Sequence, residues 1–175
     1  YETVVNNPYM DDYYKDLRRW SFAMEVFFLK ERFKDVIGFA DSENIVIQDR
    51  TLHEGVFVFT ANNYEQGNMS DRDFANYSDL FDTMMTLVKL PDLMIYIRST
   101  VPNLISQIGK RGRECEQTIR IDYLTGLNER YEEWIKNYKG RLIIVDGDTQ
   151  KFESDTEAFR KITDQIDAML YGLFK

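Results

Sequence analysis

The segment Leu93-Met94-Ile95-Tyr96-Ile97, which ends at Arg98-Ser99, is a short and mostly apolar run that stops abruptly at charged and polar residues. Two other runs have the same form, Ile45-Val46-Ile47 and Leu142-Ile143-Ile144-Val145. Unbroken apolar character over so few residues is typical of strands that are covered on both faces. We therefore predict a buried strand at each of these positions.

Stretches with the apolar spacing of helices lie between and beyond these strands, at residues 17–33, 74–88, 101–110, 122–138 and 154–173. Ser154, before an acidic first turn, is a typical N-cap, and Gly140 after Lys139 is a typical end of the preceding helix. Helices that alternate with buried strands predict an α/β fold, a parallel β-sheet flanked by helices. With 175 residues, 43% of them hydrophobic, we expect a single domain over residues 1–175.

The composition limits the class of partner and the cellular setting. A net charge of -8 argues against a nucleic-acid polymer, because such binding depends on many lysines and arginines that neutralise phosphates. Cys115 is the sole cysteine and cannot form an internal disulfide, and no apolar stretch is long enough to cross a membrane. We expect a cytoplasmic protein with no membrane partner.

The residues directly after the predicted strands are the first candidates for a site, since ligands of open parallel sheets bind at the carboxyl ends of the strands. These residues are Asp49-Arg50, Arg98-Ser99 and Asp146-Gly147-Asp148. Carboxylates beside a guanidinium suit a site for Mg²⁺ and phosphate. The alternative is that they are ordinary solvated loop charges.

A basic segment, Lys110-Arg111-Gly112-Arg113, interrupts this otherwise acidic chain. Guanidinium groups match phosphate oxygens and can stabilise a phosphoryl group in transfer, so the segment is a candidate phosphate clamp. The alternative is a solvated charge run at a helix end, neutralised by Glu114 and Glu116.

Several motifs in order resemble the deoxynucleoside kinase family, most closely its bacterial deoxyadenosine and deoxyguanosine kinase branch, from residue 1 to about residue 152. They are Glu2 with Asn7-Pro8-Tyr9, Tyr14-Lys15-Asp16 with Trp20 and Phe22, Asp49-Arg50-Thr51, residues 110–116, and Asp122-Tyr123-Leu124. The resemblance implies a P-loop kinase-like, three-layer architecture. It also implies ATP- and Mg²⁺-dependent phosphorylation of the 5'-hydroxyl of a deoxynucleoside, with purines favoured, in nucleotide salvage.

The resemblance assigns the chemical step to a few residues. Glu2 stands at the general base that accepts the proton of the 5'-hydroxyl, although Thr3 replaces the proline of the family's Glu-Pro-Val. Asp49 matches the acid that helps to hold Mg²⁺, and Arg50 the arginine that contacts the 5'-oxygen and the phosphoryl group. Arg111 and Arg113 match the arginines of a lid, at about residues 107–118, that closes on the phosphates of ATP.

Other residues match the binding positions of the family. Tyr14 and Glu116 match the pair that binds the sugar 3'-hydroxyl, and Phe59 matches an aromatic residue that stacks on the base. Asp146 to Phe152 matches the loop that receives the adenine of ATP. Family members are commonly dimers, which implies a homodimer here, with the helix at residues 17–33 as a contributor.

Position 25 is a departure from the family, which has a glutamine there to bind the base, whereas this chain has Glu25. An ionised carboxylate only accepts hydrogen bonds, and guanine offers an N–H and an amino group side by side. We therefore expect a tilt toward deoxyguanosine. Helical spacing also places Glu25 near Arg32, a position close to the base in the family, so an ion pair between them is a second expectation that does not exclude the first.

The phosphate-binding motif Gly-x-x-x-x-Gly-Lys-Ser/Thr occurs nowhere in the chain. In the family this loop and the first strand precede the general base, so we expect the chain to begin after them and to be inactive alone. Two alternatives remain: a thymidylate-kinase-like nucleoside monophosphate kinase and a non-catalytic nucleotide-binding remnant.

Overall fold

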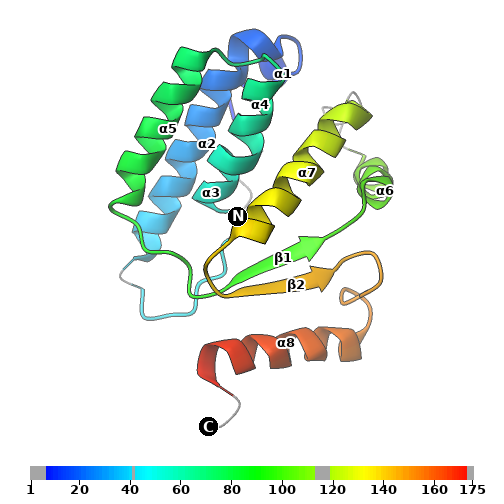
Figure 1. Ribbon diagram of the computed structural model, residues 1–175. Helices are drawn as coiled ribbons and strands as arrows, with labels where there is room; N and C mark the ends of the chain where they lie inside the picture. The colour runs from blue at the N-terminus through cyan, green and yellow to red at the C-terminus, as the bar shows by residue number, and fades with distance from the viewer. Residues whose placement is uncertain (1–6, 41, 113–118, 173–175) are drawn as a thin grey trace. The chain divides into compact units, whose positions relative to one another are not determined.

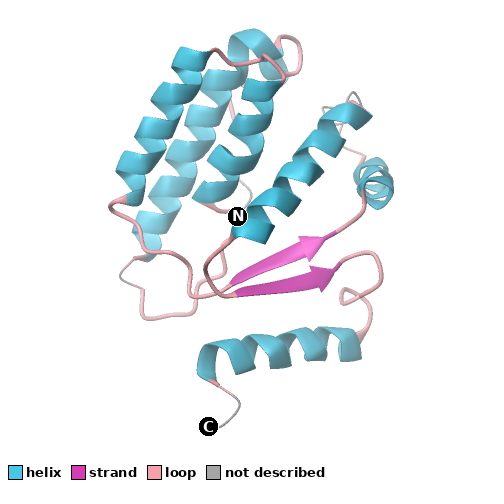
Figure 2. Ribbon diagram, in the orientation of Figure 1, coloured by secondary structure: helices cyan, strands magenta, loops and turns pink. Residues whose placement is uncertain are grey.

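A computed structural model of the chain describes residues 7–40, 42–112 and 119–172 (Figures 1 and 2). Its contacts divide it into two compact units. The first unit holds the described residues up to Lys89 together with Glu129–Trp134, and the second holds those of Leu90–Asn128 and from Ile135 onward. The single domain predicted over residues 1–175 stays a prediction.

The first unit is helical. Its elements are α1 (Met10–Tyr13), α2 (Leu17–Phe39), α3 (Leu52–Glu54), a π-helix (Gly55–Thr60), α4 (Ala61–Glu65) and α5 (Asp71–Met85). The long helices begin at capping side chains, because Asp16 accepts from Arg19 N–H and Ser70 accepts from Asp73 N–H. The segments α3, π-helix and α4 follow one another without a break and pack against α2 and α5.

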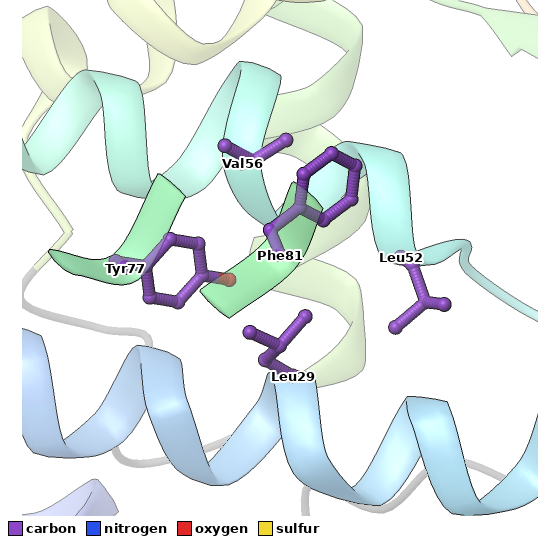
Figure 3. Packing of buried hydrophobic residues seen from close by; sticks show 5 residues of the cluster. All are labelled: Leu29, Leu52, Val56, Tyr77 and Phe81. Carbon is purple, nitrogen blue, oxygen red and sulfur yellow. The ribbon is translucent and has the colours of Figure 1, made fainter. Parts of the chain in front are cut away.

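A core of buried apolar side chains joins these helices. It consists of Leu29, Leu52, Val56, Tyr77 and Phe81, from α2, α3, the π-helix and α5. Figure 3 shows the five side chains converging between the helices. Burial of such side chains stabilises the fold by roughly 1.5–3 kcal/mol each. This core fixes the positions of α2 and of the π-helix, which carry most of the residues considered below.

The second unit contains a parallel pair of strands, β1 (Met94–Arg98) and β2 (Leu142–Asp146). Their register sets Met94 opposite Leu142 and Arg98 opposite Asp146, so the carboxyl ends of both strands lie together. Helix α6 (Val101–Arg111) follows β1, and α8 (Thr156–Tyr171) follows β2 and packs against it. Helix α7 (Ile121–Asn137) contributes residues to both units. The predicted parallel sheet flanked by helices is confirmed.

The strand predicted at Ile45-Val46-Ile47 is wrong. This segment has no strand conformation, and Ile45 and Ile47 are 79% and 93% exposed. A strand needs a hydrogen-bonded neighbour, and in the described residues the sheet contains β1 and β2 alone. Apolar content without such a neighbour does not make a strand.

Helix ends also differ from the prediction. Helix α2 continues to Phe39, and α8 is capped by Asp155 rather than Ser154, because the Asp155 carboxylate accepts from both Glu157 N–H and Ala158 N–H. Helix α7 ends at Asn137 with Tyr138 as its C-cap, before Gly140 is reached. None of the helices in the described part of the chain combines the length and apolarity of a membrane span.

Candidate functional site

An acidic side chain lies in the interior of the first unit. Glu25, on α2, is only 2% exposed and accepts a hydrogen bond from Asn63 Nδ2 of α4 at 3.0 Å. The same amide accepts through its Oδ1 from the Tyr13 hydroxyl, also at 3.0 Å. Three buried polar side chains from α1, α2 and α4 therefore form one chain of hydrogen bonds, as burial of polar groups requires.

Burial governs the charge of Glu25. Loss of solvent raises its pKa from 4.5 to about 7, against the opposing effects of the Arg32 charge, the hydrogen bond from Asn63 and the Arg50 charge. The Arg32 charge attracts the Glu25 carboxylate, and a direct ion pair between the two side chains stays a prediction. The direct hydrogen-bond partner is Asn63. Near neutral pH the carboxyl can hold or release its proton, which changes what it offers to a ligand.

Two arginines share this region with Glu25. The Arg32 guanidinium lies over the Phe28 ring at 5.2 Å, and burial followed by the nearby Arg50 charge lowers its pKa, while Glu54 and Glu25 raise it. Like charges in a partly buried site repel, so an anion or a polar group between the arginines would be stabilised.

Arg50 has an unusual conformation just before α3. Its φ is 68°, in the left-handed region that favours glycine, and its guanidinium lies over the Phe59 ring at 4.8 Å. The Tyr131 ring of α7 also meets Phe59, edge to face at 6.2 Å. Phe59, predicted to stack on a base, therefore contacts both a cation and a tyrosine.

Gly55 lies in close contact with the Tyr77 hydroxyl and near Arg32. A Cβ added at Gly55 would lie 2.9 Å from the Tyr77 hydroxyl and 3.8 Å from Arg32 Nη1. A side chain there would displace Tyr77, which is fully buried in the core shown in Figure 3. The glycine thus keeps the backbone of the π-helix close to two polar groups.

A second group of polar residues lies at the carboxyl end of the sheet in the second unit. The Asp148 carboxylate accepts from Ser99 Oγ at 2.5 Å, from Thr100 N–H at 3.1 Å and from Asn103 Nδ2 at 2.8 Å. These hydrogen bonds, with that from Ser99 foremost, lower the pKa of Asp148 to about 2. Asp148 therefore joins the loop after β2 to the start of α6.

Asp146, the last residue of β2, shapes the same loop from the other side. Its carboxylate accepts from Asp148 N–H at 2.9 Å and Thr149 N–H at 3.2 Å, and its pKa is lowered, chiefly by hydrogen bonding to Thr149. Asp146 is therefore engaged by its own loop. Phe152 lies partly buried in the turn before α8.

The remaining residues predicted for the site have the following positions. Tyr14 follows α1 with its ring 5.2 Å from that of Tyr13, Asp49 is exposed beside Arg50, and Arg111 is the exposed last residue of α6. Glu2, Arg113 and Glu116 lie outside the described residues. In the first unit the structure brings together Glu25, Arg32, Arg50 and Phe59.

Sequence reasoning missed the residues that hold these groups in place. They are Tyr13, Glu54, Asn63 and Tyr131, together with Gly55. Asn62-Asn63 directly after an apolar run was the available signal for one of them, because buried amides in a helix need specific partners.

Comparisons with known proteins identify the family. The sequence model of the family described as "Deoxynucleoside kinase" matches residues 1–171. The deoxyadenosine/deoxycytidine kinase of Bacillus subtilis (strain 168) is 32% identical over 97% of this chain and 80% of its own length, and the deoxyguanosine kinase of the same organism is 28% identical over 97% and 83%. The solved structure of deoxyadenosine kinase from M. mycoides with bound dATP has a TM-score of 0.82 and 32% identity, over 95% of this chain and 84% of that chain.

The fold and the matched sequence therefore define a kinase. The chain belongs to the deoxynucleoside kinase family, as its motifs predicted, and the P-loop kinase fold class is confirmed. The thymidylate-kinase-like alternative is not favoured by these comparisons.

Proposed function

We propose that this protein phosphorylates the 5'-hydroxyl of a purine deoxynucleoside in nucleotide salvage, using ATP and Mg²⁺. One observation carries the proposal: a buried carboxyl, Glu25, lies in the same electrostatic environment as Arg32 and Arg50. A base with both donors and acceptors can be recognised by Glu25 and Arg32. A guanidinium near the 5'-oxygen, from Arg50, would stabilise the phosphoryl group in transfer.

The base pocket would be lined by Glu25, Arg32 and Phe59. The ionised form of Glu25 accepts from the N–H and the amino group of guanine, which favours deoxyguanosine over deoxyadenosine. Relatives with 28% and 32% identity are named as a deoxyguanosine kinase and a deoxyadenosine/deoxycytidine kinase, which supports a nucleoside of this range. Tyr14 and Glu116 would bind the 3'-hydroxyl.

The reacting end would use Glu2 as the general base and Asp49 as a ligand of Mg²⁺. The described residues contain no cluster of three His, Cys, Asp or Glu side chains that could form a metal site. A lone carboxylate such as Asp49 suits Mg²⁺, which usually takes one or two protein carboxylates and completes its shell with water and phosphate. The metal would neutralise charge on the phosphates, while Arg50 meets the charge that remains.

The nucleoside triphosphate would be bound by the second unit and the lid. The loop from Asp146 to Phe152 would receive the adenine, and Arg111 and Arg113 would contact the phosphates. Structures of deoxyadenosine kinase from M. mycoides with bound dATP and dCTP support binding of a nucleoside triphosphate. A cytoplasmic location, with its supply of ATP, suits this chemistry.

A homodimer is also part of the proposal. Helix α2 leaves Ile37 and Phe39 48% and 40% exposed near its end, which suits burial against another chain. Light scattering coupled to size exclusion would give twice the mass of one chain. A monomer at the concentrations used for activity would contradict this part.

The decisive experiment is a radiolabelled phosphoryl-transfer panel with the four deoxynucleosides and ATP·Mg²⁺, run on the full gene product. We expect both purine deoxynucleosides to be phosphorylated, with the higher kcat/KM for deoxyguanosine. The variant Glu25→Gln should shift the preference toward deoxyadenosine, because a side-chain amide offers a donor as well as an acceptor. Phosphorylation of deoxynucleoside monophosphates alone, or equal base preference in both proteins, would contradict the proposal.

A further inference from the structure

The backbone at Arg50 is strained, and the structure shows what holds it. Among the described residues Arg50 alone has a positive φ without being glycine. For a residue with a Cβ that conformation costs about 1–2 kcal/mol, so neighbouring contacts must fix it.

The first contact is made by the capping box of α3. Thr51 N–H, which belongs to the peptide that follows Arg50, donates to Glu54 Oε2 at 2.5 Å, and Glu54 N–H donates back to Thr51 Oγ1 at 3.3 Å. Because the peptide plane between Arg50 and Thr51 is held by Glu54, the direction in which the Arg50 side chain leaves the backbone is held as well.

The second contact comes from α7. The Tyr131 hydroxyl donates to the other oxygen of the same carboxylate, Glu54 Oε1, at 2.8 Å. Burial raises the pKa of Tyr131 far above its ordinary value, so this hydroxyl stays a donor at every working pH. A helix cap uses one carboxylate oxygen only, so the bond to Tyr131 is additional to what α3 itself requires.

The contacts of Glu54 and Tyr131 are connected to the Arg50 side chain through Phe59. The Tyr131 ring packs on Phe59, and Phe59 in turn carries the Arg50 guanidinium at 4.8 Å. We call Thr51, Glu54, Phe59 and Tyr131 the Arg50 cradle. Glu54 holds the peptide that follows Arg50, and Phe59 contacts the Arg50 side chain. Tyr131 contacts both routes, and every member belongs to the first unit.

We propose that Tyr131, acting through Glu54, is a positioning residue that sets the Arg50 guanidinium for phosphoryl transfer. The inference rests on the proposed function, in which Arg50 meets the transferring phosphoryl group. Tyr131 touches no reacting atom in this assignment. Its effect is on the geometry of the arginine, and misplacement of a charge by a fraction of an ångström is felt in the transition state more than in substrate binding.

The test is a double-mutant cycle on the full gene product with Tyr131→Phe and Glu54→Ala. Tyr131→Phe keeps the ring on Phe59 and removes the donor alone. We expect kcat to fall about tenfold with the KM for the deoxynucleoside changed less than about twofold. Glu54→Ala should lose more, and adding Tyr131→Phe to it should cause no further loss, because in this proposal the hydroxyl acts through that carboxylate. Tyr64→Phe, which removes a hydroxyl of α4 that lies near Asp71, is the matched control and should leave kcat unchanged.

A structural role alone would lower the melting temperature of Tyr131→Phe without lowering kcat, and that result, or additive losses in the double variant, would overturn the inference. Hydrogen exchange of the Thr51 amide gives a readout independent of activity, and we expect it to be about tenfold faster in Tyr131→Phe. If the unmodified protein phosphorylates none of the four deoxynucleosides, the proposed function fails. In that case, unchanged hydrogen exchange of the Thr51 amide in Tyr131→Phe would show that Tyr131 does not hold the Arg50 backbone. Faster exchange would show that it does.

Discussion

The Asn63 amide donates to the Glu25 carboxylate at 3.0 Å and so links α4 to α2 inside the first unit. Asn63 Oδ1 accepts from the Tyr13 hydroxyl, and Nδ2 faces Glu25. In this arrangement Glu25 Oε1 is an acceptor. Only its other oxygen can change character, as an acceptor when ionised and as a donor when protonated.

The stability of the protein should fall as pH rises through the range set by Glu25. The folded-state pKa is about 7 against an ordinary value of 4.5, so the folded chain keeps a proton that the unfolded chain has released. The free energy of unfolding should then decrease between about pH 4.5 and about pH 7, by at most roughly 3 kcal/mol. Urea unfolding of the protein and of Glu25→Gln at about pH 5 and about pH 8 would measure the difference. A slope that Glu25→Gln leaves intact would assign it to another group.

The preference for guanine or adenine should depend on the protonation state of Glu25. Below the pKa of Glu25 the protonated carboxyl resembles a side-chain amide and suits adenine, and above it the carboxylate suits guanine. The ratio of kcat/KM for deoxyguanosine over deoxyadenosine should rise up to about tenfold from about pH 6 to about pH 8. Glu25→Gln should hold this ratio constant. The idea fails if the ratio is equally flat in both proteins.

Asp148→Ala should disconnect the loop after β2 from the start of α6. The substitution removes the acceptor for Ser99, Thr100 and Asn103 together. We expect the melting temperature to fall by about 4 °C or more, and the KM for ATP to rise with little change for the deoxynucleoside. The unchanged protein should lose the contribution of Asp148 as pH falls from about 4 toward about 2, since its folded pKa is lowered to about 2. Asp164→Ala on the exposed face of α8 is the control and should alter neither value.

Gly55→Ala should disturb the region beside Arg32. The added methyl would stand 2.9 Å from the Tyr77 hydroxyl, closer than carbon and oxygen tolerate, so Tyr77 or the π-helix must shift. We expect a loss of about 1–3 kcal/mol in unfolding free energy and weaker deoxynucleoside binding by calorimetry. Gly55→Ala combined with Tyr77→Phe should recover part of both losses, because the clashing oxygen is gone. Equal losses in the single and the double variant would show that the clash is not the cause.

Much of the fold followed from local pattern. The runs at Leu93–Ile97 and Leu142–Val145 gave the parallel strands, and apolar spacing gave the five long helices to within a few residues of their ends, apart from the extension of α2 to Phe39. Ile45–Ile47 has the composition of a strand, but the prediction of a strand there is wrong. A strand also needs a neighbouring strand to pair with, and composition does not show whether one is present.

The site followed less well from local pattern. Family motifs indicated Glu25, Arg50 and Phe59, but the π-helix at Gly55–Thr60 adds a residue to its turn and shifts the faces of the helix that follows. Counting in steps of 3.6 therefore does not place Asn63 against Glu25. The Tyr131 to Glu54 bond spans 77 positions along the chain and leaves no periodic signal.

Because the backbone of Arg50 is left-handed, thermal stability and catalysis favour different residues at position 50. Glycine adopts φ 68° without penalty, so Arg50→Gly should relieve strain and raise thermal resistance if the arginine contributes little packing, while abolishing phosphoryl transfer. Directed evolution for heat resistance alone would drift away from arginine at this position. An alanine scan would misjudge it, because Arg50→Ala removes the charge and keeps the strain.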